Sequence, residues 1–202
     1  EELFFSYSGL KTQAVHALEQ LEAKGLRMPP IGLPGEAAEG AVLDAIPQRL
    51  GHALQALDVL VKEALAAGNT SPVYHALTRP PELEGEATNR AIQLARVAGA
   101  PLYVVHVSCR EAVHPIAVAR EQGWDVWGET CTQYFFVDTT FLERPDFEGA
   151  KYVYTPPPRD KANQDVLWNA VRTDVLSAVS TDHCAFLWDG QKTMGKDDFS
   201  KI

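Results

Sequence analysis

The sequence contains few cysteines, and their spacing matches no structural framework. Its 202 residues include three of them, Cys109, Cys131 and Cys184. An odd number of widely separated cysteines fits neither a zinc-knuckle pattern nor a set of disulfides. Reduced thiols in a cytoplasm are the simplest interpretation, because disulfides rarely persist there.

Positive charge and long hydrophobic runs are also scarce. Lys and Arg number 18 against 27 Asp and Glu, and the basic residues are scattered. A nucleic-acid partner is not expected, because contact with the phosphate backbone requires a basic stripe. No apolar run approaches the roughly 20 residues that span a bilayer, and no charged-then-apolar leader opens the sequence. We therefore expect a cytoplasmic protein with neither a nucleic-acid nor a membrane partner.

The residues that are present suit a folded α/β domain. A hydrophobic content of 46% over 202 residues is ample for the core of one large domain, or a piece of one. Residues 85–100 have a helical apolar face, with Gly99 at the position of a C-cap glycine. Strands that alternate with helices at this spacing predict βαβ units and a parallel sheet. Comparable patterns predict further helices over 9–25, 52–68, 110–123 (with Pro115 in its first turn) and 163–173, and strands over 3–8, 101–107, 124–130 and 175–181.

Polar side chains follow three of the strand-like segments. His106 ends "LYVVH", Thr155 ends "KYVYT", and Asp182 and His183 follow "LSAVST". Ligands bind at the carboxyl ends of strands in parallel barrels and in open parallel sheets. These positions are therefore the first candidates for a functional site.

Several longer motifs resemble the hydantoinase and dihydropyrimidinase family, which comprises cyclic amide hydrolases of the amidohydrolase superfamily. The motifs are "VYHALTRPPELEGEATNRAIQLA", "APLYVVHVSC", "GWDVWGETCTQY", "FEGAKYVYTPPPRDK" and "TDHCAF". The resemblance covers about residues 58–202, whereas 1–57 match poorly. It implies a (β/α)8 TIM-like barrel of the metal-dependent hydrolase type, of which 1–202 would form a single catalytic domain or its C-terminal portion. It also implies two Zn²⁺ ions per active site, or other divalent metals, and a homo-oligomer, either a tetramer or a dimer.

The resemblance assigns roles to individual residues. It implies that His106 and Asp182 are metal ligands and that the Thr155 hydroxyl binds the substrate ring. His52, in "HALQALD", is a candidate for a further ligand. Imidazole and carboxylate are good zinc donors, and zinc lowers the pKa of its bound water from 15.7 to about 7. The implied reaction is hydrolysis of a hydantoin or dihydropyrimidine by a metal-bound hydroxide, with Asp182 as the proton shuttle.

Two departures from the family pattern support another hypothesis. No H-x-H pair occurs among the six histidines, and "FFSYSG" has Ser8 where the family has a metal-bridging Lys. A dihydropyrimidinase-related scaffold protein, non-catalytic and without a complete metal site, is the alternative function. An H-x-H strand and a Tyr-Lys strand preceding residue 1 would favour the enzyme.

Each candidate also has a structural interpretation. His106 could be a core histidine, Asp182 a turn former, and Thr155 a residue held extended by the proline after it. His75 is expected to support loop structure, and Glu129 to have a structural role. Five aromatic residues are expected in the core: Trp124, Trp127, Tyr134, Phe135 and Phe136.

Overall fold

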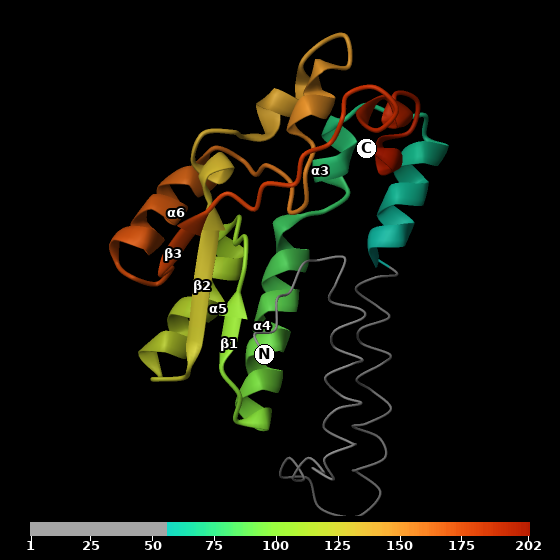
Figure 1. Ribbon diagram of the computed structural model, residues 1–202. Coiled ribbons are helices and arrows are strands. Elements are labelled where there is room, and N and C mark those ends of the chain that lie inside the picture. The colour runs from blue at the N-terminus through green and yellow to red at the C-terminus, as the bar shows by residue number, and fades with distance from the viewer. Residues whose placement is uncertain (1–55) are drawn as a thin grey trace, which may run out of the picture.

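The computed structural model of the chain describes residues 56–202 (Figure 1). The strand and helix expected over 3–25 and the candidate ligand His52 lie outside this range. Residues 56–66 form the described part of the helix expected over 52–68. Gly68 follows it with a φ of 79°, a left-handed conformation that glycine adopts without a steric penalty.

Three parallel strands form the sheet, in the order of the sequence. They are β1 (Leu102–Val104), β2 (Val126–Cys131) and β3 (Ala178–Ser180), with β2 in the centre. Parallel neighbours require a crossover connection. Helix α5 (Arg110–Glu121) lies between β1 and β2 in the chain, and α6 (Ala162–Arg172) lies between β2 and β3. The predicted βαβ units and parallel sheet are confirmed.

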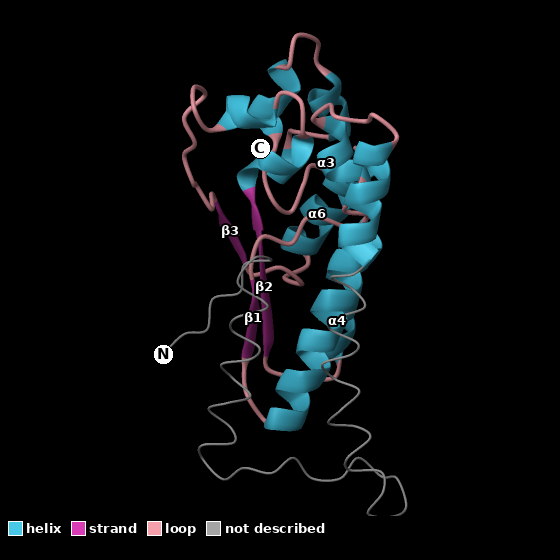
Figure 2. Ribbon diagram, turned by 90° about the vertical axis from the view of Figure 1, so that its right-hand side faces the viewer, coloured by secondary structure: helices cyan, strands magenta, loops and turns pink. Residues whose placement is uncertain are grey.

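The helices cover one face of this sheet. Helix α4 (Pro81–Ala98), α5 and α6 lie on the same side of the strands (Figure 2). Their apolar faces and the strands form the core, whose fully buried members include Ile92, Ile116, Leu167, Leu176 and Val107. Sequential strand order with helices on one face matches a sector of a (β/α)8 barrel, whereas a doubly wound sheet has helices on both faces. No closed barrel is present in residues 56–202.

Helices α4 and α5 pack closely because Gly85 has no side chain. A Cβ at this position would lie 2.8 Å from both the Cβ and the carbonyl oxygen of Glu111. Pro115 lies in the second turn of α5, so the prediction that it occupies the first turn is wrong. Its ring nitrogen cannot donate to the carbonyl four residues earlier, which is that of Glu111. Helix α5 therefore lacks one internal backbone hydrogen bond, in the turn that packs against Gly85.

Short helical segments gather at the carboxyl ends of the strands (Figure 1). Most of them belong to segments that the sequence analysis left without helix or strand. They are α3 (Val73–Leu77), η1 (Thr132–Phe135), η2 (Thr139–Glu143), η3 (Glu148–Tyr152), η4 (Lys192–Gly195) and η5 (Phe199–Lys201). One of them, Glu148–Tyr152, covers the start of "KYVYT", so the strand-like interpretation of that run is wrong.

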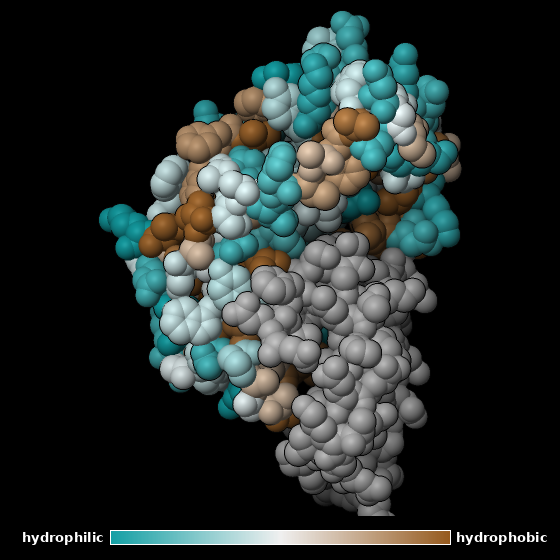
Figure 3. Space-filling view, viewed as in Figure 1, coloured by the Kyte–Doolittle hydropathy of each residue, from teal (hydrophilic) through white to brown (hydrophobic). Residues whose placement is uncertain are grey.

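The aromatic side chains divide between the core and the surface. Tyr134 and Phe135 are buried and Trp124 packs against the core, as predicted. The same prediction is wrong for Trp127 and Phe136, which are 45% and 67% exposed. Trp127 lies on β2, with the Arg120 guanidinium of α5 5.0 Å from its ring centre, and Phe136 follows η1. Apolar surface accordingly appears on the strand and α6 side of the molecule (Figure 3).

Candidate functional site

His106 lies in a bulge just after β1. Leu102 N–H donates to the Asp125 carbonyl, whereas Val107 N–H donates to the Glu129 carbonyl, so the β1 side has one extra residue. His106 takes up this bulge with a left-handed backbone at φ 47°. Its Nε2 is buried and has no hydrogen-bond partner in residues 56–202. A buried nitrogen without a partner is costly in a folded protein unless a ligand satisfies it.

The chain just after His106 is anchored by a buried ion pair. Arg159 Nη2 lies 2.8 Å from Glu84 Oε2, and both residues are 8% exposed. Ser108 N–H donates to Glu84 Oε1 at 2.8 Å, and Arg159 Nε donates to Ser108 Oγ at 2.9 Å. The Ser108 hydroxyl also donates to Glu84. Glu84 lies in the first turn of α4, so this pair connects α4, the His106 bulge and the segment after Thr155.

Thr155 is an exposed residue whose hydroxyl contacts a buried histidine. It precedes Pro156 through a cis peptide bond. Its Oγ1 lies 3.2 Å from His75 Nε2. Burial, followed by the nearby Arg79 charge, lowers the pKa of His75 to about 3, so the imidazole is neutral near pH 7. His75 belongs to helix α3 and not to a loop, which corrects the prediction for this residue.

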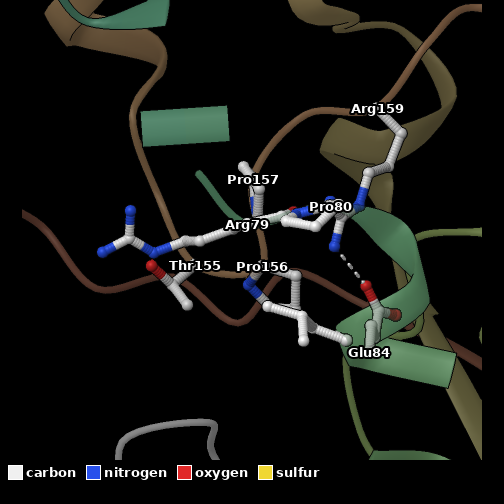
Figure 4. Close-up of a pocket in the computed structure, with 8 residues that line it drawn as sticks. Arg79, Pro80, Glu84, Thr155, Pro156, Pro157 and Arg159 are labelled. Atoms are coloured by element: carbon white, nitrogen blue, oxygen red, sulfur yellow. Dashed lines mark hydrogen bonds and ion pairs between the residues drawn. The ribbon is translucent and has the colours of Figure 1, made fainter. Parts of the chain in front are cut away.

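A small pocket separates the Thr155 segment from the start of α4 (Figure 4). The Glu84–Arg159 ion pair lies in its wall, as the dashed line in Figure 4 shows. Arg79 donates from Nη1 to the His75 carbonyl at 3.0 Å, and its own carbonyl accepts from Arg159. The pocket is lined by Arg79, Pro80, Leu83, Glu84, Thr155, Pro156, Pro157 and Arg159.

Asp182 follows β3 and is exposed, together with His183 and Cys184. It also has a left-handed backbone, with φ 43°. Strand β2 lies between β1 and β3, so His106 and Asp182 come from strands that are not neighbours. The carboxylate of Glu129 connects the three strands, because Tyr103 and Ser180 each donate to it at 2.8 Å. The structural role predicted for Glu129 is confirmed by these contacts.

The described residues contain no complete metal site. Across 56–202, no three His, Cys, Asp or Glu side chains lie close enough together to hold a metal ion. His106 Nε2 and the Asp182 carboxylate are donors of the types that zinc binds. The buried, unpartnered state of Nε2 fits a ligand role for His106. Two donors do not complete a site, and His52 lies outside the described residues.

The three cysteines are free thiols, of which Cys109 and Cys131 are buried. Burial raises the pKa of Cys131 to about 11 and that of Cys109 further. Both side chains are therefore protonated near pH 7. Among residues 56–202, no helix is both long and apolar enough to cross a membrane.

Comparison with known proteins decides the family. The chain is 58% identical over 146 residues to a D-hydantoinase of Geobacillus stearothermophilus, which covers 72% of this chain and 31% of that protein. It is 46% identical over 142 residues to a dihydropyrimidinase of Arabidopsis thaliana, covering 70% and 27%. The chain belongs to the hydantoinase and dihydropyrimidinase family. It spans about a third of the length of the curated relatives it matches. No family model matches it.

Solved structures of this family contain a segment that matches the described residues. A dihydropyrimidinase from Brevibacillus agri matches with a TM-score of 0.72 and 62% identity, over 73% of this chain and 32% of that one. A D-hydantoinase from a Thermus species matches with a TM-score of 0.70 and 37% identity, over the same shares. The chain is therefore α/β and corresponds to a segment of these larger proteins.

Proposed function

We propose that the chain is part of a zinc-dependent hydrolase that opens cyclic amides, either hydantoins or dihydropyrimidines. The family membership supports this reaction class. The observation that carries the assignment to particular residues is the His106 bulge, in which a buried Nε2 has no partner at the carboxyl end of β1. Asp182 occupies the corresponding position after β3.

The proposed roles follow from the chemistry of each side chain. A zinc ion, when bound, acidifies a water molecule and polarises the ring carbonyl. His106 and Asp182 would hold the ion through Nε2 and a carboxylate oxygen. Asp182 also accepts the proton of the attacking water and delivers it to the departing amide nitrogen. Thr155 offers its hydroxyl to the substrate ring, while His75 fixes the orientation of that hydroxyl.

A scaffold protein is the second candidate function. It is favoured by the finding that residues 56–202 contain no group of three metal-binding side chains. In that case the chain would bind protein partners and hydrolyse nothing. In either case we propose a cytoplasmic homo-oligomer, a dimer or a tetramer.

Hydrolysis of hydantoin and dihydrouracil tests the proposal and separates the two candidates. The whole protein to which the chain belongs is purified and supplied with Zn²⁺, and ring opening is followed by the loss of ultraviolet absorbance. We expect zinc-dependent turnover that falls by about 100-fold or more in Asp182→Asn, because general acid–base groups contribute 10²–10⁴-fold. A folded whole protein that opens neither ring with zinc present would overturn the hydrolase assignment and favour the scaffold.

A further inference from the structure

We propose that Arg159 is a positioning residue that couples the bulge carrying His106 to the segment carrying Thr155. Its partner in this role is Glu84. The inference deepens the proposed function and rests on it, because His106 and Thr155 are the proposed metal and substrate contacts. The argument depends on which atoms the Arg159 guanidinium touches on each side.

On one side the guanidinium reaches the His106 bulge. Arg159 Nε donates to Ser108 Oγ at 2.9 Å, and Nη2 donates to Glu84 at 2.8 Å. Glu84 in turn accepts the Ser108 backbone N–H at 2.8 Å. Ser108 lies two residues after His106, so these contacts fix the end of the bulge and with it the left-handed backbone of His106.

On the other side the guanidinium is linked to Thr155 through Arg79 and His75. Arg159 Nη1 donates to the Arg79 carbonyl, and the Arg79 side chain donates to the His75 carbonyl at 3.0 Å. His75 Nε2 then contacts Thr155 Oγ1 at 3.2 Å. Arg159 also belongs to the Thr155 segment, and its own carbonyl accepts from Thr139 N–H at 3.1 Å. One side chain thus joins the two proposed contacts of the site.

The energetics favour positioning over stabilisation as the role of this pair. Glu84 and Arg159 are each 8% exposed, and removing two charges from water offsets much of the attraction between them. A buried ion pair is therefore weak support for stability, but its geometry is strict. Arg159 uses Nε, Nη1 and Nη2 on three different acceptors, which the single ammonium of a lysine cannot reproduce.

Hydrogen exchange of backbone amides tests the coupling in the metal-free chain. The variants are Arg159→Lys and Glu84→Gln, with Asp174→Asn as the matched control. Asp174 lies in the turn between α6 and β3 and forms an ion pair at 3.1 Å with Arg120, which also donates to the carbonyl of Val126 at the start of β2. This pair is therefore at the amino-terminal ends of the strands, whereas the His106 bulge is at the carboxyl end of β1. We expect amides in 105–109 and in 152–159 to exchange about tenfold faster or more in both variants, because each variant weakens hydrogen bonds to a charged group. The control should leave both segments unchanged.

Three results would overturn the coupling. The first is unchanged exchange in both segments, and the second is faster exchange in 105–109 alone, because Arg159 would then act on one side only. The third is faster exchange throughout the chain, which indicates a general loss of stability. Failure of the proposed function gives a different combination of results. The unaltered protein would then open no ring, while hydrogen exchange in the two variants would still change as expected.

The kinetics separate positioning from a structural role when the chain is active. A merely structural residue would lower the active fraction, and therefore the apparent kcat, without changing KM. We expect Arg159→Lys to lower kcat and raise KM together, because it disturbs both His106 and Thr155. Unchanged KM in that variant would contradict the link to Thr155.

Discussion

At the scale of the residue, the two candidate ligands share an uncommon backbone conformation. His106 and Asp182 have φ values of 47° and 43°, in the left-handed region. This conformation costs a residue with a side chain about 1–2 kcal/mol. Strained residues of this kind concentrate at functional sites, where the surrounding structure maintains them. Both lie just beyond the carboxyl end of a strand, where a ligand is expected.

Replacement of Asp182 by glycine should therefore stabilise the fold while removing the proposed function. Asp182 is exposed, so the change removes backbone strain and buries nothing. We expect the free energy of unfolding to rise by about 1 kcal/mol and ring opening to be lost. Urea denaturation and the hydrolysis assay measure the two effects. The control is Asp174→Gly, with φ 58°, which should keep its activity. A less stable or fully active Asp182→Gly would contradict the account.

His75 should make stability depend on pH. Its pKa is lowered from 6.5 to about 3, so the folded state binds this proton less readily than the unfolded state does. Stability is complete above pH 6.5 and is lost as the pH falls towards 3. The expected slope in this window is about 1.4 kcal/mol per pH unit for one proton. Urea denaturation at pH 7, 6 and 5 measures it.

The control for His75 uses an exposed histidine. His75→Gln should flatten the pH dependence, whereas His114→Gln should leave it unchanged because His114 lies exposed on α5. Equal slopes in the wild-type chain and in His75→Gln would show that His75 does not titrate as its burial requires.

At the scale of the element, the contact between α4 and α5 depends on Gly85. Gly85→Ala places a Cβ 2.8 Å from the Glu111 carbonyl oxygen, so the two helices must separate. We expect a loss of about 1–3 kcal/mol in the free energy of unfolding, as for other overpacked contacts. Helix propensity alone predicts the opposite, a gain of about 1 kcal/mol. A higher Tm in Gly85→Ala would therefore contradict the packing described for this contact.

Elements with local signals were predictable from the sequence, and irregular ones were not. The end of α4 followed from Gly99, which adopts a φ of 62°. The bulge at His106 depends on how β1 pairs with β2. No local sequence pattern predicts this pairing. Pro115 lies in the second turn of α5, and the close approach of that helix to Gly85 is a tertiary contact that the local sequence does not reveal. The short helical segments between β2 and α6 have no apolar periodicity to reveal them.

The site shows the same division between local and long-range information. His106, Thr155 and Asp182 could be proposed because each follows a strand-like run in a family motif. Glu84 and Arg159 were missed because they lie 75 positions apart in proline-containing segments, where single charges usually indicate exposed loops. The segments "RPPELEGE" and "TPPPRDK" lie within motifs that resemble the family, but nothing in one sequence shows that the two charges meet.

At the scale of the whole molecule, an exposed aromatic cluster on η1 and α6 predicts self-association. Phe135 stacks on Trp168 with ring centroids 4.1 Å apart, and Phe136 meets the same ring edge-on at 6.4 Å. Phe136 and Trp168 are 67% and 51% exposed. Exposed apolar patches of this kind mark interaction surfaces. We expect the chain to sediment as more than one copy.

The double variant Phe136→Ser and Trp168→Gln should shift the chain towards the monomer in sedimentation velocity. Trp127, which is exposed on β2, provides a control in Trp127→Gln, which should leave the assembly unchanged. A monomeric wild-type chain would contradict the role of this cluster.

Zinc binding by the chain tests the central claim most directly. The affinity is measured by competition with a chromogenic chelator, for the whole protein to which the chain belongs and for its double variant His106→Asn and Asp182→Asn. We predict that the wild-type protein binds zinc and that the double variant binds it at least tenfold more weakly, which corresponds to about 1.4 kcal/mol. Equal affinities, or no zinc bound by the wild-type protein, would contradict the assignment of His106 and Asp182 as metal ligands.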